Sequence, residues 1–83
     1  MEYRVRRMMR WYEHDPRGTL VGEAELRGVS LQDLQRLFNV GPDDPMWDCY
    51  RVCCEHVPGL LSYLDVTIEL ERYSYFVEAE AVD

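Results

Sequence analysis

The stretch YRVRRMMRWYE, residues 3–13, alternates between apolar and basic side chains. Its apolar phase holds Tyr3, Val5, Met9 and Trp11, and its basic phase holds Arg4, Arg6 and Arg10. A period of two residues predicts a β-strand, because successive side chains of a strand point to opposite faces. Arg7 is an exception to the pattern, as a basic residue in the apolar phase. The stretch therefore predicts a sheet with one apolar face and one charged face.

A second strand is predicted directly after a turn. Residues 14–18 (HDPRG) contain the Pro and Gly that tight turns favour. In the strand that follows, the inward side chains are predicted to be Leu20, Gly22, Ala24 and Leu26. Glu23 and Glu25 then lie on the outward face. The two strands predict an antiparallel hairpin in which the outward Arg row faces the outward Glu row.

One helix is predicted over residues 28–41 (GVSLQDLQRLFNVG). Ser30 is a favourable N-cap and Asp33 occupies the third position of the first turn. An apolar stripe with helical spacing comprises Leu31, Leu34, Leu37 and Phe38. Gly41 is expected to end the helix.

The remaining residues predict further strands. Residues 47–54 alternate, with an inner set of Tyr50, Val52 and Cys54. Residues 55–64 predict an irregular segment, with one helical turn broken by Pro58 and Gly59. Residues 66–71 (VTIELE) and 75–82 (YFVEAEAV) predict strands divided by a polar kink at residues 72–74. The pattern as a whole predicts an α+β fold, a mostly antiparallel sheet with one helix on its face.

Length and charge narrow the classes of function. A chain of 83 residues forms one domain, residues 1–83, around one small core. It has no apolar run near the ~20 residues that span a bilayer and no apolar signal segment, so we expect a cytoplasmic chain with reduced thiols and no membrane partner. The net charge is −7, and residues 11–83 hold five Arg against fifteen acidic residues. Such a charge disfavours binding to nucleic acid and favours a basic protein partner.

Three cysteines and a histidine fall within residues 49–56 (CYRVCCEH). On a strand, Cys49 and Cys53 lie roughly 13 Å apart, whereas two ligands of one zinc ion lie within about 4 Å of each other. We therefore expect no metal site and no cofactor. Cys54 with His56 lacks the orienting group and oxyanion hole of a nucleophile, so we expect no catalytic residue. Cys54 is instead interpreted as a small core side chain.

Two surface patterns remain. The outward phase of residues 47–53 places Trp47, Cys49, Arg51 and Cys53 in one row. Aromatic and Arg side chains of this kind anchor protein partners, although a helix packed over them is an equal alternative. Three Glu-x-Glu pairs, at residues 23/25, 69/71 and 78/80, present adjacent carboxylates. These pairs fit either a solvated face with Arg partners or a surface for a basic protein.

Four stretches in order resemble the cloacin/colicin immunity protein family: WYEHD (11–15), GE (22–23), CYRVCCEHVPGLLSYL (49–64) and YFVEAEA (75–81). Members of that family are small acidic proteins that bind and neutralise ribosome-cleaving bacteriocins. The resemblance implies a four-stranded antiparallel sheet with one short helix, and inhibition by binding without catalysis. It also implies that Cys49 lies in the toxin-binding face and that Tyr12 matches an aromatic contact. An Arg-rich first strand, Arg51 in place of an acid, and the GPDDPM loop (41–46) depart from the family pattern, and leave the toxin's identity and class open.

We therefore expect an immunity protein that binds one cognate nuclease toxin domain, a basic ribonuclease, and occludes it one to one. The expected partner-binding residues are Tyr12, Glu23, Glu25, Trp47, Cys49 and Arg51. One alternative is an immunity-like fold used as a general protein–protein interaction module, or a homodimer when free. A small cysteine enzyme is the third hypothesis.

Overall fold

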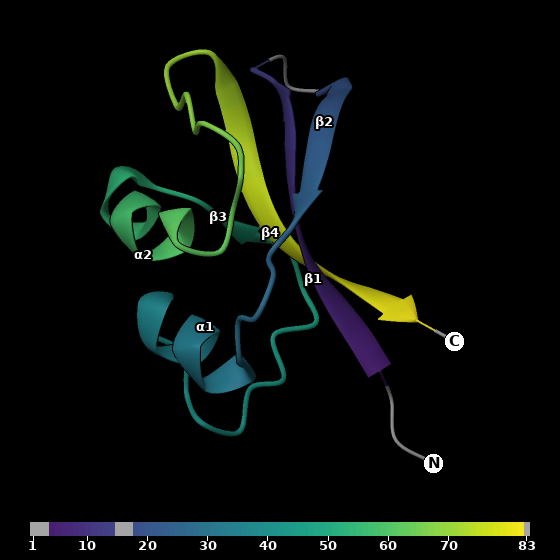
Figure 1. Cartoon of the computed structure of the whole chain (residues 1–83), viewed down its shortest axis with the longest axis vertical. Coiled ribbons are helices and arrows are strands. Elements are labelled where there is room, and N and C mark those ends of the chain that lie inside the picture. Colours follow the sequence, from purple (N-terminus) through teal and green to yellow (C-terminus); the bar gives the residue numbers. More distant parts are fainter. Residues whose placement is uncertain (1–3, 15–17, 83) are drawn as a thin grey trace.

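The computed structural model describes residues 4–14 and 18–82, so Tyr3 and most of the predicted 14–18 turn lie outside the described residues. Four strands, two short α-helices and a 3-10 turn follow one another along the chain (Figure 1). In chain order they are β1 (Arg4–Glu13), β2 (Leu20–Glu25), α1 (Leu31–Leu37), β3 (Tyr50–Arg51), η1 (Cys54–His56), α2 (Val57–Leu61) and β4 (Tyr73–Val82).

The strands form one antiparallel sheet in the order β2-β1-β4-β3. The two long central strands pair along their whole length, from Arg4 opposite Val82 to Glu13 opposite Tyr73. Both helices lie on the same side of this sheet (Figure 1). The predicted α+β class and four-stranded antiparallel sheet are confirmed, with a second short helix that the sequence did not predict.

Alternation in β1 gives the sheet its two faces. Met9 is fully buried beneath the helices, and Trp11 packs against the same core. Arg7 shares their phase, and its guanidinium donates hydrogen bonds to the backbone carbonyls of Met46 and Pro45. The exception in the sequence pattern is therefore an Arg that fastens a loop to the inner face.

Leu20 was predicted to point inward, but it is 51% exposed, so this prediction is wrong. The register between β1 and β2 shifts after Trp11, so that Leu20 pairs with Tyr12. An extra residue in one strand changes which side chains share a face, and Tyr12 belongs to the outward phase. The other inward predictions for β2 hold, since Gly22 and Ala24 are half-buried and Leu26 is buried.

The core joins the sheet to both helices. Its buried residues are Met9, Leu26, Leu34, Met46, Val52, Leu60, Tyr75 and Val77. Helix α1 begins as predicted, with Ser30 and Asp33 in a capping box. It ends earlier than predicted: Phe38 is the C-cap and Asn39 has a positive φ of 55°, so the helix stops before Gly41. Asn tolerates this left-handed conformation better than most residues.

The C-terminal half differs most from the prediction. Strand β3 has only two residues, and Cys54, predicted to be inward, is exposed at the start of η1. Pro58 does not break a helix but lies in the first turn of α2, where its missing N–H costs nothing. Gly59 is also helical, and a Cβ there would lie 2.7 Å from Leu37, so the glycine permits close contact between the two helices.

Residues 66–71 form no strand, contrary to the prediction. Their alternating apolar side chains, Val66, Ile68 and Leu70, still pack against the core. Strand β4 begins at Tyr73, so the predicted kink at residues 72–74 lies at its start. Among the described residues, no helix is long and apolar enough to cross a membrane.

Candidate interaction surface

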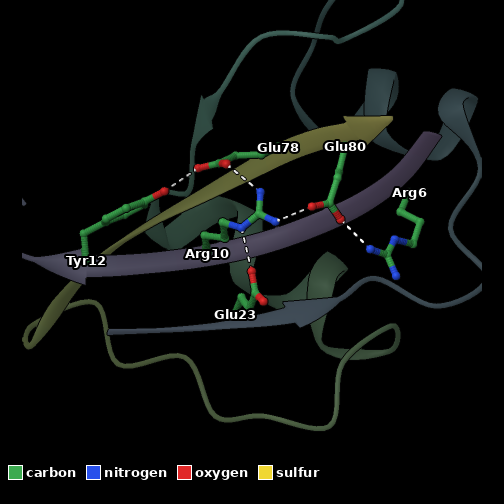
Figure 2. Close-up of polar contacts among 6 residues, drawn as sticks. All are labelled: Arg6, Arg10, Tyr12, Glu23, Glu78 and Glu80. Atoms are coloured by element: carbon green, nitrogen blue, oxygen red, sulfur yellow. Dashed lines mark hydrogen bonds and ion pairs between the residues drawn. The ribbon is translucent and has the colours of Figure 1, made fainter. Parts of the chain in front are cut away.

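The sheet face opposite the helices carries a connected set of polar and aromatic side chains. We call this surface the outer face, and its residues are Arg6, Arg10, Tyr12, Glu23, Glu25, Phe76, Glu78 and Glu80. They come from β1, β2 and β4, and belong to the phase opposite to the core residues of the same strands. Figure 2 shows six of them in contact across the three strands.

Arg10 is the centre of the outer face. Its guanidinium binds Glu23 on β2 (Nε to Oε1, 2.7 Å) and Glu78 on β4 (Nη1 to Oε1, 3.0 Å). A third bond reaches Glu80 (Nη2 to Oε1, 3.1 Å), which also binds Arg6 at 2.6 Å (Figure 2). Hydrogen bonds to Glu23 and Glu78 raise the pKa of Arg10, and hydrogen bonds from Arg6 and Arg10 lower that of Glu80.

This network confirms that the outward Arg row faces the outward Glu row. It also assigns a role to part of the Glu-x-Glu pattern, because three of these carboxylates have Arg partners in the network and a fourth, Glu69, pairs with Arg72. Glu25 differs, since it is exposed and forms no ion pair with another described residue. Of the two predicted β2 contact residues, Glu25 is therefore the one available to a partner.

Glu78 brings together two of the predicted contact residues. The Tyr12 hydroxyl donates to Glu78 Oε2 at 2.9 Å, and its ring meets Phe76 edge-on at 5.8 Å. The Cys49 thiol lies close enough to the same carboxylate for its charge to act on the thiol. Burial, followed by Glu78, raises the pKa of both Tyr12 and Cys49. Glu78 was not among the contact residues predicted from the sequence, although its position in a Glu-x-Glu pair was a usable signal.

The predicted row from Trp47 to Cys53 is not one row. Arg51 borders the outer face, with its guanidinium carbon 5.8 Å from the centroid of the Phe76 ring. Trp47 instead lies beside Val5, Ala79 and Ala81, whose phase is that of the core. The helices cover the inner face, so the alternative in which a helix covers this row is not observed.

Two backbone features break the row. Met46 has a positive φ of 53°, which turns the chain just before Trp47. At the other end of the row, Cys53 is the N-cap of the 3-10 turn η1, so it no longer follows the alternation of β3. Strand periodicity therefore extends over only two or three residues here, too few to keep Trp47 and Cys53 on the face of Arg51.

The η1 turn gathers three types of metal-ligating side chain that an extended strand would separate. Donor atoms of Cys53, Glu55 and His56 lie within 4.8 Å of one another. However, His56 Nδ1 accepts a hydrogen bond from the Cys53 backbone N–H at 2.9 Å, and the ring lies 4.3 Å from that of Phe38. Accepting at Nδ1 places the ring proton on Nε2, which lies 3.9 Å from a Glu55 carboxylate oxygen. Nδ1 is thus occupied as a hydrogen-bond acceptor, and the observed arrangement is a cap for the turn.

The fold and the surface together define a small α+β protein. One face of its sheet is uncovered and carries charged and aromatic side chains, and the helices pack on the other face. The chain belongs to the family described as "Domain of unknown function (DUF7683)", which matches residues 6–78. No curated protein is similar enough to the chain to match it.

Proposed function

We propose that this protein is an immunity protein that inhibits a cognate basic nuclease toxin, a ribonuclease, by one-to-one binding in the cytoplasm and without catalysis of its own. The observation that carries the proposal is the outer face, where Tyr12, Cys49 and Arg51 surround a fixed network of charges. Aromatic and Arg side chains are the residue types that most often dominate binding energy at protein interfaces. The resemblance to the cloacin/colicin immunity family supports the same class of function.

Preorganisation supports a binding role for this face. Arg10 holds carboxylates from both neighbouring strands, so the outer face needs little reordering when a partner docks. Inhibition would be steric: the sheet covers the RNA-binding surface of the nuclease, and the nuclease cannot reach its substrate. The net charge of −7 accelerates encounter with a basic nuclease.

The direct test mixes the protein with the nuclease domain encoded beside it and measures cleavage of ribosomal RNA. Loss of cleavage at equimolar inhibitor, with a one-to-one complex on a sizing column, is the expected result. Full cleavage without a complex would overturn the proposal for that pair.

Glu25 offers a test of the docking face that leaves the internal network intact. Glu25→Lys should lower the association rate and reduce its dependence on salt, because this carboxylate forms no ion pair with another described residue. Glu71→Lys, which reverses an exposed acid in the loop before β4, is the matched control. An association rate equal to that of the wild type in Glu25→Lys, or an equal effect of both variants, would argue against docking through the outer face.

The cysteine-enzyme alternative makes the opposite prediction about thiol chemistry. A nucleophilic thiol has a lowered pKa, whereas burial and Glu78 raise the pKa of Cys49. Alkylation of Cys49 by iodoacetamide at neutral pH should therefore be slower than that of free cysteine. Faster alkylation of Cys49, or of Cys54 close to His56, would favour the enzyme.

A further inference from the structure

Trp47 stands at a hollow on the inner sheet face, beyond the two helices. The hollow has a volume of ≈ 210 Å³ and is lined by Val5, Trp47, Ala79 and Ala81, and we call it the Trp47 hollow. Here the start of β1 and the end of β4 run on past the helices (Figure 1). Trp47 is 62% exposed, more than any other exposed large hydrophobic residue described. The small side chains of Ala79 and Ala81 leave space beside its ring.

The loop that carries Trp47 is fixed from the helix side by Gln35. This side chain is the one buried polar residue among those described, at 7% exposure. Its amide nitrogen donates to the carbonyls of Pro42 (3.1 Å) and Asp44 (2.8 Å). A buried amide that bonds two loop carbonyls gives the loop a single backbone conformation.

A second set of contacts fixes the loop from the sheet side. The Arg7 guanidinium donates to the Met46 carbonyl, and the Asp44 carboxylate accepts from the Met46 N–H (2.8 Å) and the Tyr50 hydroxyl (3.1 Å). Met46 itself is buried, at 1% exposure, with a positive φ. The residue immediately before the exposed Trp is therefore anchored by its backbone and its side chain.

Such a loop presents the large exposed side chain of Trp47 from a backbone that is already fixed on folding. Preorganised Trp residues are among the commonest dominant contacts at protein interfaces. Asp43 and Asp48 lie in the same loop, are exposed, and form no ion pair with another described residue. On the outer face, by contrast, Arg10 already neutralises the Glu78 carboxylate. The three carboxylates of this loop (Asp43, Asp44 and Asp48) outnumber the Arg7 guanidinium that contacts it, so the charge next to Trp47 is acidic on balance and matches a basic partner.

We propose that residues 42–48 with the Trp47 hollow form the main affinity anchor for the basic nuclease, with an apolar side chain of the nuclease in the hollow and Lys or Arg groups on Asp43 and Asp48. This inference rests on the proposed function. It adds that the nuclease reaches around the β3 side of the sheet and contacts the inner face as well as the outer one. Gln35 and Arg7 then act as positioning residues.

The test measures the affinity and rates of complex formation with the nuclease domain encoded beside the chain. Trp47→Ala should weaken binding by about 30-fold or more, mainly through faster dissociation, which is the range of a dominant interface contact. Leu61→Ala, which truncates an exposed apolar residue on α2, is the matched control and should leave the affinity unchanged. A thermal melt of each variant checks that the fold is retained.

Ala81→Leu provides an independent variant in case Trp47→Ala disturbs the loop. Ala81 is exposed, so a larger side chain fills the hollow without entering the core, and binding should weaken. Asp48→Asn should lower the association rate.

The outcomes separate this inference from the proposed function. Full affinity in both Trp47→Ala and Ala81→Leu, together with weak binding by Glu25→Lys, overturns the anchor but keeps the immunity function. A wild-type chain that does not bind the nuclease overturns both. A free dimer that Trp47→Ala dissociates would assign the hollow to a second copy of the chain and overturn the basic partner.

Discussion

Replacement of Arg10 by Met tests whether the outer face depends on the charge network at its centre. Met keeps much of the apolar stem of the Arg side chain and removes the guanidinium, so the change acts mainly on the three ion pairs. The side chain of Arg10 is 18% exposed and that of Glu78 is 15% exposed, whereas Glu23 is 51% exposed. The loss should therefore come mostly from Glu78.

The magnitude follows from these exposures. An exposed pair such as Arg10–Glu23 contributes about 0.2–1 kcal/mol, and the loss of one partner from a fully buried pair costs about 3–5 kcal/mol. Glu78 lies between these limits, and Glu80 keeps Arg6 as a partner. We expect Arg10→Met to lower the free energy of unfolding by about 2 kcal/mol, which in a domain of this size corresponds to a decrease in Tm on the order of 10 °C.

The assay is urea unfolding followed by circular dichroism at pH 7, at low and at high salt. Arg36→Met is the control, because its ion pair with Asp33 is exposed, with the Arg36 side chain at 77%. That variant should change stability by less than about 0.5 kcal/mol. The double variant Arg10→Met/Glu78→Gln should recover part of the loss, since the carboxylate left without Arg10 is then neutral. A loss in Arg10→Met no larger than in Arg36→Met would refute the reasoning.

Three further changes test the packing, the helix cap and the response to acid. Gly22→Ala should destabilise the fold by about 1–3 kcal/mol in urea unfolding, because its Cβ would lie 2.4 Å from an atom of the Trp11 ring. Gly41→Ala is the neutral control, because a Cβ at Gly41 has no atom within 4 Å. Equal stability of both variants would contradict the packing of Gly22 against Trp11. Ser30→Ala should cost about 1 kcal/mol, since its hydroxyl accepts the backbone N–H of the third helical residue, and an unchanged Tm would exclude this cap. The pKa of Glu80 is lowered in the folded state, so this carboxylate contributes stability above its ordinary value of 4.5, and that contribution is lost as the pH falls through the folded pKa. Unfolding midpoints should therefore fall below about pH 4.5 and fall less in Glu80→Gln, whereas parallel pH profiles would contradict the assignment.

The sequence by itself determined the strands and the helix in which apolar side chains recur at one regular spacing. The alternation of β1 predicted its two faces, and the Glu row of β2 predicted one partner of Arg10, Glu23. The signals at the start of α1 were local, so Ser30 and Asp33 could be assigned as its cap without knowledge of the rest of the fold. The α+β class followed from these pieces, because an apolar sheet face and an apolar helix stripe bury each other.

Only the tertiary structure decided where the periods stop. The positive φ at Met46 and the register shift opposite Tyr12 each interrupt the alternation of side chains. As a result, Trp47 and Leu20 lie on other faces than their positions in the sequence pattern predict. Glu78 meets Tyr12 because β4 pairs with β1, and the two residues lie 66 positions apart in sequence. Such long-range pairing depends on packing between distant segments and not on local preference. For this reason the sequence could propose contact residues one by one, whereas their division between the outer face and the Trp47 hollow was set by the folded sheet.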